Sequence, residues 1–202
     1  MTPNPLLDFS DLPLFDRLRA EHVAPAVDAL LAEANAALEA VTQPDFPADW
    51  STMSARLDVA TERLGRAWGA VSHLNSVADT PELRTAYNEA LPRVTEFWTR
   101  LGADERLYAK YKAMDPATLN AEQRQALKNA MRNFVLSGAE LTGAAKERFA
   151  RIQERQAELS RSFYEHVLDA TQAWTLHLDS PERLAGLPES AHRRARPGRT
   201  RV

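Results

Sequence analysis

The stretch SHLNSVADTPELRTAYNEALP, residues 72–92, predicts a corner between two helices. Its first residues end a run with helical periodicity, and Thr80 and Pro81 then start another, with the threonine as N-cap and the proline at the first helical position. Pro92 falls inside the second helix, which we expect it to kink or to split in two. The stretch holds no set of residues that can carry out a reaction alone, so its predicted role is to fix the packing of the two helices.

Helical periodicity continues on both sides of this corner. Apolar residues recur at steps of three and four in residues 57–74 before it and in residues 83–101 after it. Further helices are expected at residues 22–42, 105–114, 120–136 and 144–177. The expected N-caps are Ser51, for the helix before the corner, and Asn120. Only residues 174–178 alternate as a short strand would, so the predicted fold is an all-α, multi-helix domain with long antiparallel helices.

The two ends of the chain differ from this helical body. Pro3, Pro5 and Pro13 predict an extended leader that packs without regular structure. At the other end, five arginines and no acidic residue lie in the last ten positions. We expect residues 1–191 to form one helical domain, and the Arg-rich tail at 192–202 to be disordered or translated out of frame.

Composition narrows the class of protein. The 202 residues include no cysteine, which excludes disulfides, a thiolate nucleophile and cysteine-ligated metal sites, and favours a cytoplasmic location. The formal charge is −3 even with the basic tail counted, so the body is acidic and a poor match for nucleic acid. The N-terminus has neither the basic start nor the apolar run of a signal peptide, and no membrane span is expected.

The histidines give no recognisable zinc site. None of the five starts the His-Glu-x-x-His pattern that places two imidazoles on one helix face. The best remaining cluster is Glu165, His166 and Asp169, in which the histidine and the second acid lie one turn apart and could share a metal or a proton. Such pairs are common on solvated helix faces, which is the interpretation that we prefer. We therefore expect no catalytic, cofactor-binding or metal-binding residue in this chain.

Two other local patterns fail as sites for physical reasons. Ser72, His73 and Asn75 lack the strained Gly-x-Ser-x-Gly turn of a nucleophilic serine, and capping or buried hydrogen bonding is the better interpretation of the histidine. Gly65 and Gly69 lack the Lys-Ser/Thr that completes a phosphate-binding loop, so close helix packing is their expected role.

Eight aromatic side chains are candidates for a surface on which bases or peptide side chains could stack. They are Trp50, Trp68, Trp98, Trp174, Tyr87, Tyr108, Tyr111 and Tyr164. Most occupy core positions of the predicted helices, so core packing is the preferred interpretation. Trp98 and Tyr111 fit the core pattern least well.

Six blocks of the chain, in order, resemble the amino-terminal region of bacterial members of the thimet oligopeptidase family of zinc metallopeptidases. They are NPLL at 4–7, the stretch from Pro13 to Pro25, SHLNSVADTPELRTAYNEALP at 72–92, NFVLSGAEL at 133–141, LSRSFYEHVLDATQAW at 159–174 and LAGLPESA at 184–191. The resemblance implies an almost wholly helical fold in which a deep channel between two halves admits only short, unstructured peptides. It also implies that the zinc-binding His-Glu-x-x-His helix lies in the other half, which this sequence does not reach.

The resemblance ends at His192, where the family continues with an Ala-rich helix and this sequence turns to arginine. A truncation or frameshift after about Ala191 is the expected cause. We expect this chain to be the channel-wall portion of an oligopeptidase that uses zinc in its complete form, to be inactive alone, and to self-associate through an uncovered face. The alternative is a free-standing helical module that binds peptides or proteins. A nucleic-acid binder using the basic tail is a third interpretation.

Overall fold

The computed structural model describes residues 4–190. The chain divides into two compact units, Met1–Ala157 and Glu158–Val202, which are treated separately below. Every regular element within residues 4–190 is a helix, which confirms the predicted all-α class. None of these helices is long and apolar enough to cross a membrane. The predicted basic tail, residues 192–202, lies outside the described residues.

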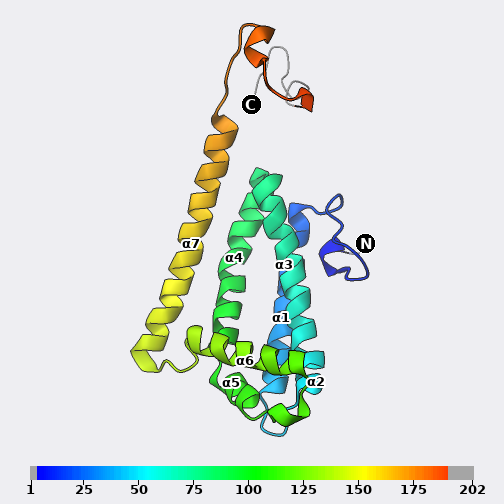
Figure 1. The fold of residues 1–202 in the computed structure, drawn as a ribbon, viewed down its shortest axis with the longest axis vertical. Coiled ribbons are helices and arrows are strands. Elements are labelled where there is room, and N and C mark those ends of the chain that lie inside the picture. The colour runs from blue at the N-terminus through cyan, green and yellow to red at the C-terminus, as the bar shows by residue number, and fades with distance from the viewer. Residues whose placement is uncertain (1–3, 191–202) are drawn as a thin grey trace. The chain divides into compact units, whose positions relative to one another are not determined.

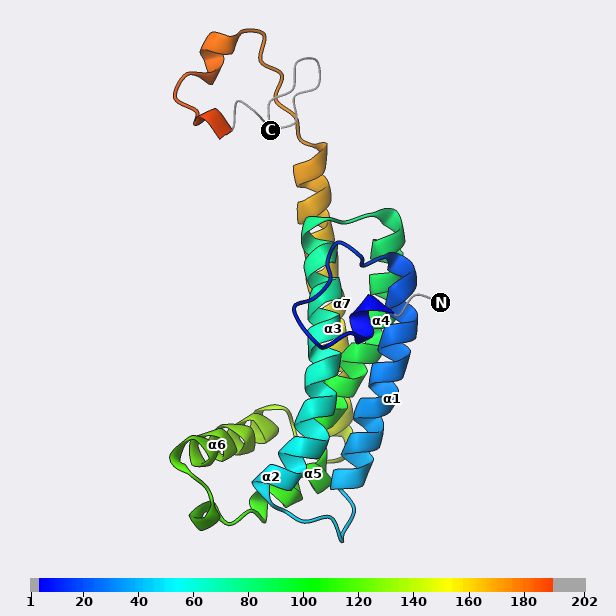
Figure 2. The same cartoon turned by 90° about the vertical axis from the view of Figure 1, so that its right-hand side faces the viewer.

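Three long helices form the centre of the first unit. They are α1 (Val23–Val41), α3 (Val59–Val77) and α4 (Pro81–Gly102). They run side by side, and α1 packs against both of the others (Figure 1, Figure 2). Because apolar residues recur every three or four positions, each helix buries one face. These faces meet in a core that includes Leu30, Leu64, Val94 and Phe97, each at most 2% exposed.

The corner between α3 and α4 forms as predicted. Thr80 Oγ1 accepts a hydrogen bond from the backbone N–H of Leu83 at 3.2 Å, and Pro81 is the first residue of α4. This helix continues as a single element through Pro92, so of the two expected effects, a kink or a split, the split does not occur. A proline inside a helix costs about 3 kcal/mol. Ala90 and Val94, two residues before and after Pro92, are both buried, and such burial stabilises the helix against this cost.

A second group of elements lies at one end of these helices. It comprises α2 (Trp50–Met53), the π-helical turn η3 (Ser54–Asp58), α5 (Glu105–Lys112), η4 (Pro116–Thr118) and α6 (Ala121–Leu136). In both views α6 runs across the direction of α1 and α3 (Figure 1, Figure 2). Apolar side chains of this group form a second core with the C-terminal half of α1, which includes Leu38, Met53, Leu107, Leu127 and Phe134.

Side-chain caps set the start of two helices in this group. Asn120 Oδ1 accepts from the backbone N–H of Gln123 at 2.8 Å, and Gln123 Oε1 accepts from the Asn120 N–H at 3.0 Å, which confirms the predicted cap as part of a capping box. The prediction of Ser51 is wrong. Asp49 caps instead, because its carboxylate accepts from the Thr52 N–H at 3.0 Å, and the helix starts at the residue after it.

The leader has more regular structure than predicted. It contains two 3₁₀ turns, η1 (Pro5–Leu7) and η2 (Ala20–His22), and both contact α1. Asn4 Nδ2 donates to the His22 carbonyl at 2.9 Å, and Leu6 is 4% exposed. The predicted packing of the leader against the helical body is therefore confirmed by the burial of Leu6. The predicted lack of regular structure is wrong, because the leader forms two 3₁₀ turns that a hydrogen bond joins.

The C-terminal part of the described chain contains α7 (Gly143–Ala173) and the 3₁₀ turn η5 (Pro181–Leu184). Gly138, which follows the C-cap of α6, has a left-handed φ of +89°, as expected for the glycine at which a helix ends. The helix ends at Ala173, four residues before the predicted end. Residues 174–178 form no strand. The period-two pattern there belongs to an irregular connection.

Candidate functional site

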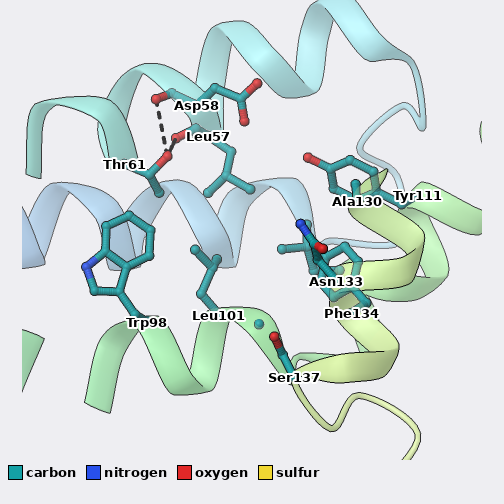
Figure 3. A pocket seen from close by; sticks show the side chains of 12 residues that line it. Leu57, Asp58, Thr61, Trp98, Leu101, Tyr111, Ala130, Asn133, Phe134 and Ser137 are labelled. Atoms are coloured by element: carbon teal, nitrogen blue, oxygen red, sulfur yellow. Dashed lines mark hydrogen bonds between the residues drawn. The ribbon is translucent and has the colours of Figure 1, made fainter. Parts of the chain in front are cut away.

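A pocket of about 340 Å³ opens on the first unit between η3, α4, α5 and α6 (Figure 3). Its apolar lining comes from all four elements and includes Leu57, Leu101, Leu107 and Phe134. Its polar lining comprises Asp58, Thr61, Asn133, Ser137 and the hydroxyl of Tyr111. An apolar cavity with a few converging polar groups is the usual form of a small-ligand site, which makes this pocket the candidate functional site.

The π-helical turn forms one wall of the pocket. Ser54 Oγ donates to Asp58 Oδ2 at 2.6 Å across the turn. Thr61 Oγ1 donates back to the carbonyls of Leu57 at 3.0 Å and Asp58 at 3.2 Å. A π-helical turn inserts an extra residue into an α-helix, shifts the side chains that follow it, and often occurs at functional sites. Here both residues at the end of the turn, Leu57 and Asp58, line the pocket.

Tyr111 and Trp98 lie at opposite ends of the pocket (Figure 3). The Tyr111 ring packs against Phe134 with the centroids 5.3 Å apart, and its hydroxyl points into the space below η3. Burial, with a smaller contribution from the charge of Asp58, raises the pKa of Tyr111 to about 12. The hydroxyl therefore remains protonated at neutral pH. Trp98 is 38% exposed and packs edge-on against Phe97.

These two residues are the aromatic side chains that fit the predicted core pattern least well, and the structure gives them a pocket in common. Others behave as predicted. Trp68 stacks on Tyr87 with the centroids 4.8 Å apart, and Tyr108 is buried. Core packing is wrong for two others, because Trp174 is 55% exposed and Tyr164 is 70% exposed.

The acidic and histidine cluster of α7 does not become a metal site. Glu165 Oε2 accepts from Arg161 Nη1 at 2.9 Å, one turn away, and this ion pair is partly buried, with side-chain exposures of 27% for Arg161 and 16% for Glu165. Across residues 4–190, no three acidic or histidine side chains are placed to hold a metal ion. The residues present, including His166 and Asp169, therefore do not fit a zinc site.

His73 takes a different role from the one predicted. Its ring packs edge-on against Phe15 with the centroids 5.6 Å apart, which links the leader to α3. Its carbonyl accepts from Ser76 Oγ at 2.7 Å at the end of the helix. The histidine is thus a packing residue at the corner, and the imagined nucleophilic arrangement with Ser72 is not assembled.

Close helix packing occurs at a glycine that the sequence patterns did not single out. A Cβ added to Gly102 would lie 2.9 Å from Ser137 Cβ, which is closer than a carbon contact allows. The space beside Gly69 is open, and a Cβ on Gly65 would only touch Trp98, at 4.0 Å. The prediction for Gly65 and Gly69 is therefore wrong. Gly102 brings α4 and the end of α6 together at the edge of the pocket.

Comparison with known proteins places these features in a family. The family model of the neurolysin/thimet oligopeptidase N-terminal domain matches residues 27–146, which contain all of the pocket-lining residues. Oligopeptidase A of Salmonella typhimurium is 42% identical over 192 residues, and that of Escherichia coli is 40% identical over 192 residues. The probable cytosolic oligopeptidase A of Arabidopsis thaliana is 35% identical over 195 residues.

These alignments cover nearly all of this chain but only a small share of each relative. The alignments cover 93% of this chain with the two bacterial proteins and 95% with the plant protein, but 28% of each relative. The chain therefore spans under a third of the length of the relatives it matches. Because the family model covers more than half of this sequence, the protein belongs to the neurolysin/thimet oligopeptidase family, of which it contains the N-terminal domain.

Proposed function

We propose that this chain supplies part of the wall of a peptide channel in a zinc-dependent oligopeptidase that cleaves short peptides. The observation that carries the proposal is the match of 93% of the chain to 28% of proteins named oligopeptidase A. Residues 4–190 do not fit a zinc site, so we derive no catalytic step for this chain. In a complete enzyme, zinc would polarise the scissile carbonyl and activate water. We propose the cytoplasm as the compartment.

The chain alone is expected to bind no stoichiometric zinc and to show no turnover of an internally quenched short peptide. The reason is that the residues present assemble no group of three metal ligands within the described range. Metal analysis after dialysis and a fluorescence assay measure the two quantities. A complete oligopeptidase A assayed in parallel is the positive control. Zinc at one equivalent together with turnover would contradict the proposal.

The alternative function is a free-standing helical module that binds peptides or proteins. The pocket on the first unit favours it, because that pocket is formed entirely by this chain. The same peptides distinguish the two functions in the absence of zinc. Saturable binding without cleavage supports the free-standing module. Absence of binding supports the channel-wall function, in which the rest of an enzyme is needed to hold a peptide.

Self-association of this chain is a further part of the proposal. Within the second unit, α7 exposes a stripe of apolar side chains at helical spacing, and Trp174, the residue after the end of the helix, is exposed as well. The exposed fractions are 52% for Leu159, 64% for Phe163, 48% for Val167 and 55% for Trp174. Exposed apolar surface of this kind favours association with a second copy.

Light scattering at rising concentration is expected to give a mass above 22.6 kDa, and the variant Phe163→Asp is expected to restore the monomer mass. The matched control is Gln172→Asp, because nine residues are about two and a half turns and place Gln172 on the opposite side of α7. A monomeric parent protein at high concentration, or the same change in mass for both variants, would argue against association through this stripe.

A further inference from the structure

The pocket between η3, α4, α5 and α6 offers unused hydrogen-bonding groups. Asp58 is the only charged side chain among the residues that line it. Ser54 donates to one of its carboxylate oxygens, and no residue between 4 and 190 donates to the other. In the same part of the chain, the Tyr111 hydroxyl and the Asn133 side-chain amide make no hydrogen bond. A ligand can therefore satisfy groups that the protein leaves open.

The lining selects for a cation. An ammonium group donates three hydrogen bonds and accepts none, so it matches the carboxylate of Asp58 and the oxygen atoms of Tyr111 and Asn133. An anion would be repelled by the carboxylate, and a neutral apolar molecule would make no hydrogen bond with these oxygens. Because Asp58 is exposed, the ammonium at this end keeps part of its hydration and avoids the cost of burying a charge.

The remainder of the pocket suits an apolar body. Leu101 lies between the polar end of the pocket and Trp98 in Figure 3, and Leu57 faces it from η3. The indole of Trp98 is partly exposed and provides a flat surface for an aromatic ring. The volume of about 340 Å³ falls at the lower end of the about 300–1,000 Å³ of small-molecule pockets, which limits the ligand to one ring and a short chain.

We propose that this pocket binds a primary ammonium group carried on an aromatic or branched apolar body. The ammonium lies between Asp58 and Tyr111, and the body extends over Leu101 toward Trp98. Both a free amine and the amino-terminal residue of a peptide carry this chemistry. The proposal does not rest on the proposed peptidase function, because it requires only the folded first unit.

Titration of the full chain followed by ¹⁵N NMR tests the site. Phenethylamine and phenylalanyl-glycine amide are the two ammonium probes, and the indole N–H signal of Trp98 is expected to shift saturably with at least one of them. Binding of the amine alone assigns the site to free amines, and binding of the peptide assigns it to peptide amino termini. Phenethyl alcohol and phenylacetate, which are matched in size, are expected to bind at least about tenfold more weakly. Equal binding of the alcohol and the ammonium probes, or no saturable shift with either ammonium probe, overturns the proposal.

Two variants test the placement of the ligand. Asp58→Asn is expected to weaken ammonium binding at least about tenfold, because it removes the charge. Ala130→Leu keeps a good helix former on α6 and fills the pocket, so it is expected to abolish the shift for both probes. The matched control is Asp45→Asn, which removes an exposed charge that does not line the pocket. Unchanged affinity in Asp58→Asn or in Ala130→Leu, with the fold intact by circular dichroism, rejects the assigned site.

Discussion

Replacing Phe97 by alanine is expected to lower the free energy of unfolding by about 3–5 kcal/mol. Phe97 is 2% exposed and belongs to the core that α4 forms with α1 and α3. Its removal leaves a cavity between three long helices, which cannot close without moving whole helices against one another. The loss is large compared with the total stability of about 5–15 kcal/mol of a typical protein. Urea denaturation followed by circular dichroism at 222 nm, a standard helix wavelength, measures it.

Phe15→Ala is the matched control, because it removes the same atoms from a leader side chain that is 42% exposed and packs against the His73 ring of α3. Its expected loss is less than half that of Phe97→Ala, since much of the ring is already in water. Equal losses in the two variants would mean that the three-helix core does not dominate stability.

Local hydrogen-bond chemistry explains which boundaries could be predicted. Thr80 and Asn120 are caps in the structure because each is followed three residues later by the N–H that its side-chain oxygen accepts. Ser51 has the right chemistry for a cap, but it already lies inside the helix, because Asp49 caps it by accepting from the Thr52 N–H. Two candidates only two residues apart cannot be ranked from the sequence, because the result depends on where the preceding chain enters the helix.

The pocket could not be predicted as a site because its walls are far apart in the sequence. Asp58, Trp98 and Asn133 come from three different elements, and nothing local marks them as neighbours. The π-helical turn that ends at Asp58 was not predicted, because the apolar pattern of the sequence indicates a continuous helix there. The one usable signal was the poor fit of Trp98 and Tyr111 to their apolar stripes. It indicated two residues of the site without indicating that they lie together.

Asp104→Ala is expected to lower the free energy of unfolding by about 2–3 kcal/mol at pH 7, because one carboxylate joins three interactions. Asp104 Oδ1 caps α5 by accepting from the N–H groups of Arg106 at 2.9 Å and Leu107 at 3.0 Å. Its other oxygen pairs with the Arg106 guanidinium at 2.8 Å, and Arg106 also pairs with Glu39 of α1 at 2.8 Å. The aspartate therefore helps to hold α5 against the central helices.

The effect of Asp104→Ala is expected to depend on pH. Burial acts to raise the pKa of Asp104, but hydrogen bonds from Arg106 and the Leu107 N–H outweigh it, and the pKa lies below its ordinary value. A carboxylate whose pKa is lower in the folded than in the unfolded protein stabilises the fold fully above the unfolded pKa of about 3.9. This stabilisation is lost as the pH falls through the lower pKa of the folded state. The difference between the parent protein and Asp104→Ala should therefore be constant from pH 7 to about 5 and shrink below about 4.

Two further variants separate the contributions of charge and capping at this position. Asp104→Asn keeps a good N-cap and removes the charge, so its free energy of unfolding at pH 7 should lie between those of the parent protein and Asp104→Ala. At low pH it should be close to that of the parent protein. Glu39→Gln breaks only the exposed side of the Arg106 pairing and should have a smaller effect than either, because exposed ion pairs are screened by water. Urea midpoints at pH 7, 5, 4 and 3 give the comparison. A gap between the parent protein and Asp104→Ala that stays constant down to pH 3 would show that capping geometry, and not the ionised carboxylate, holds α5 in place.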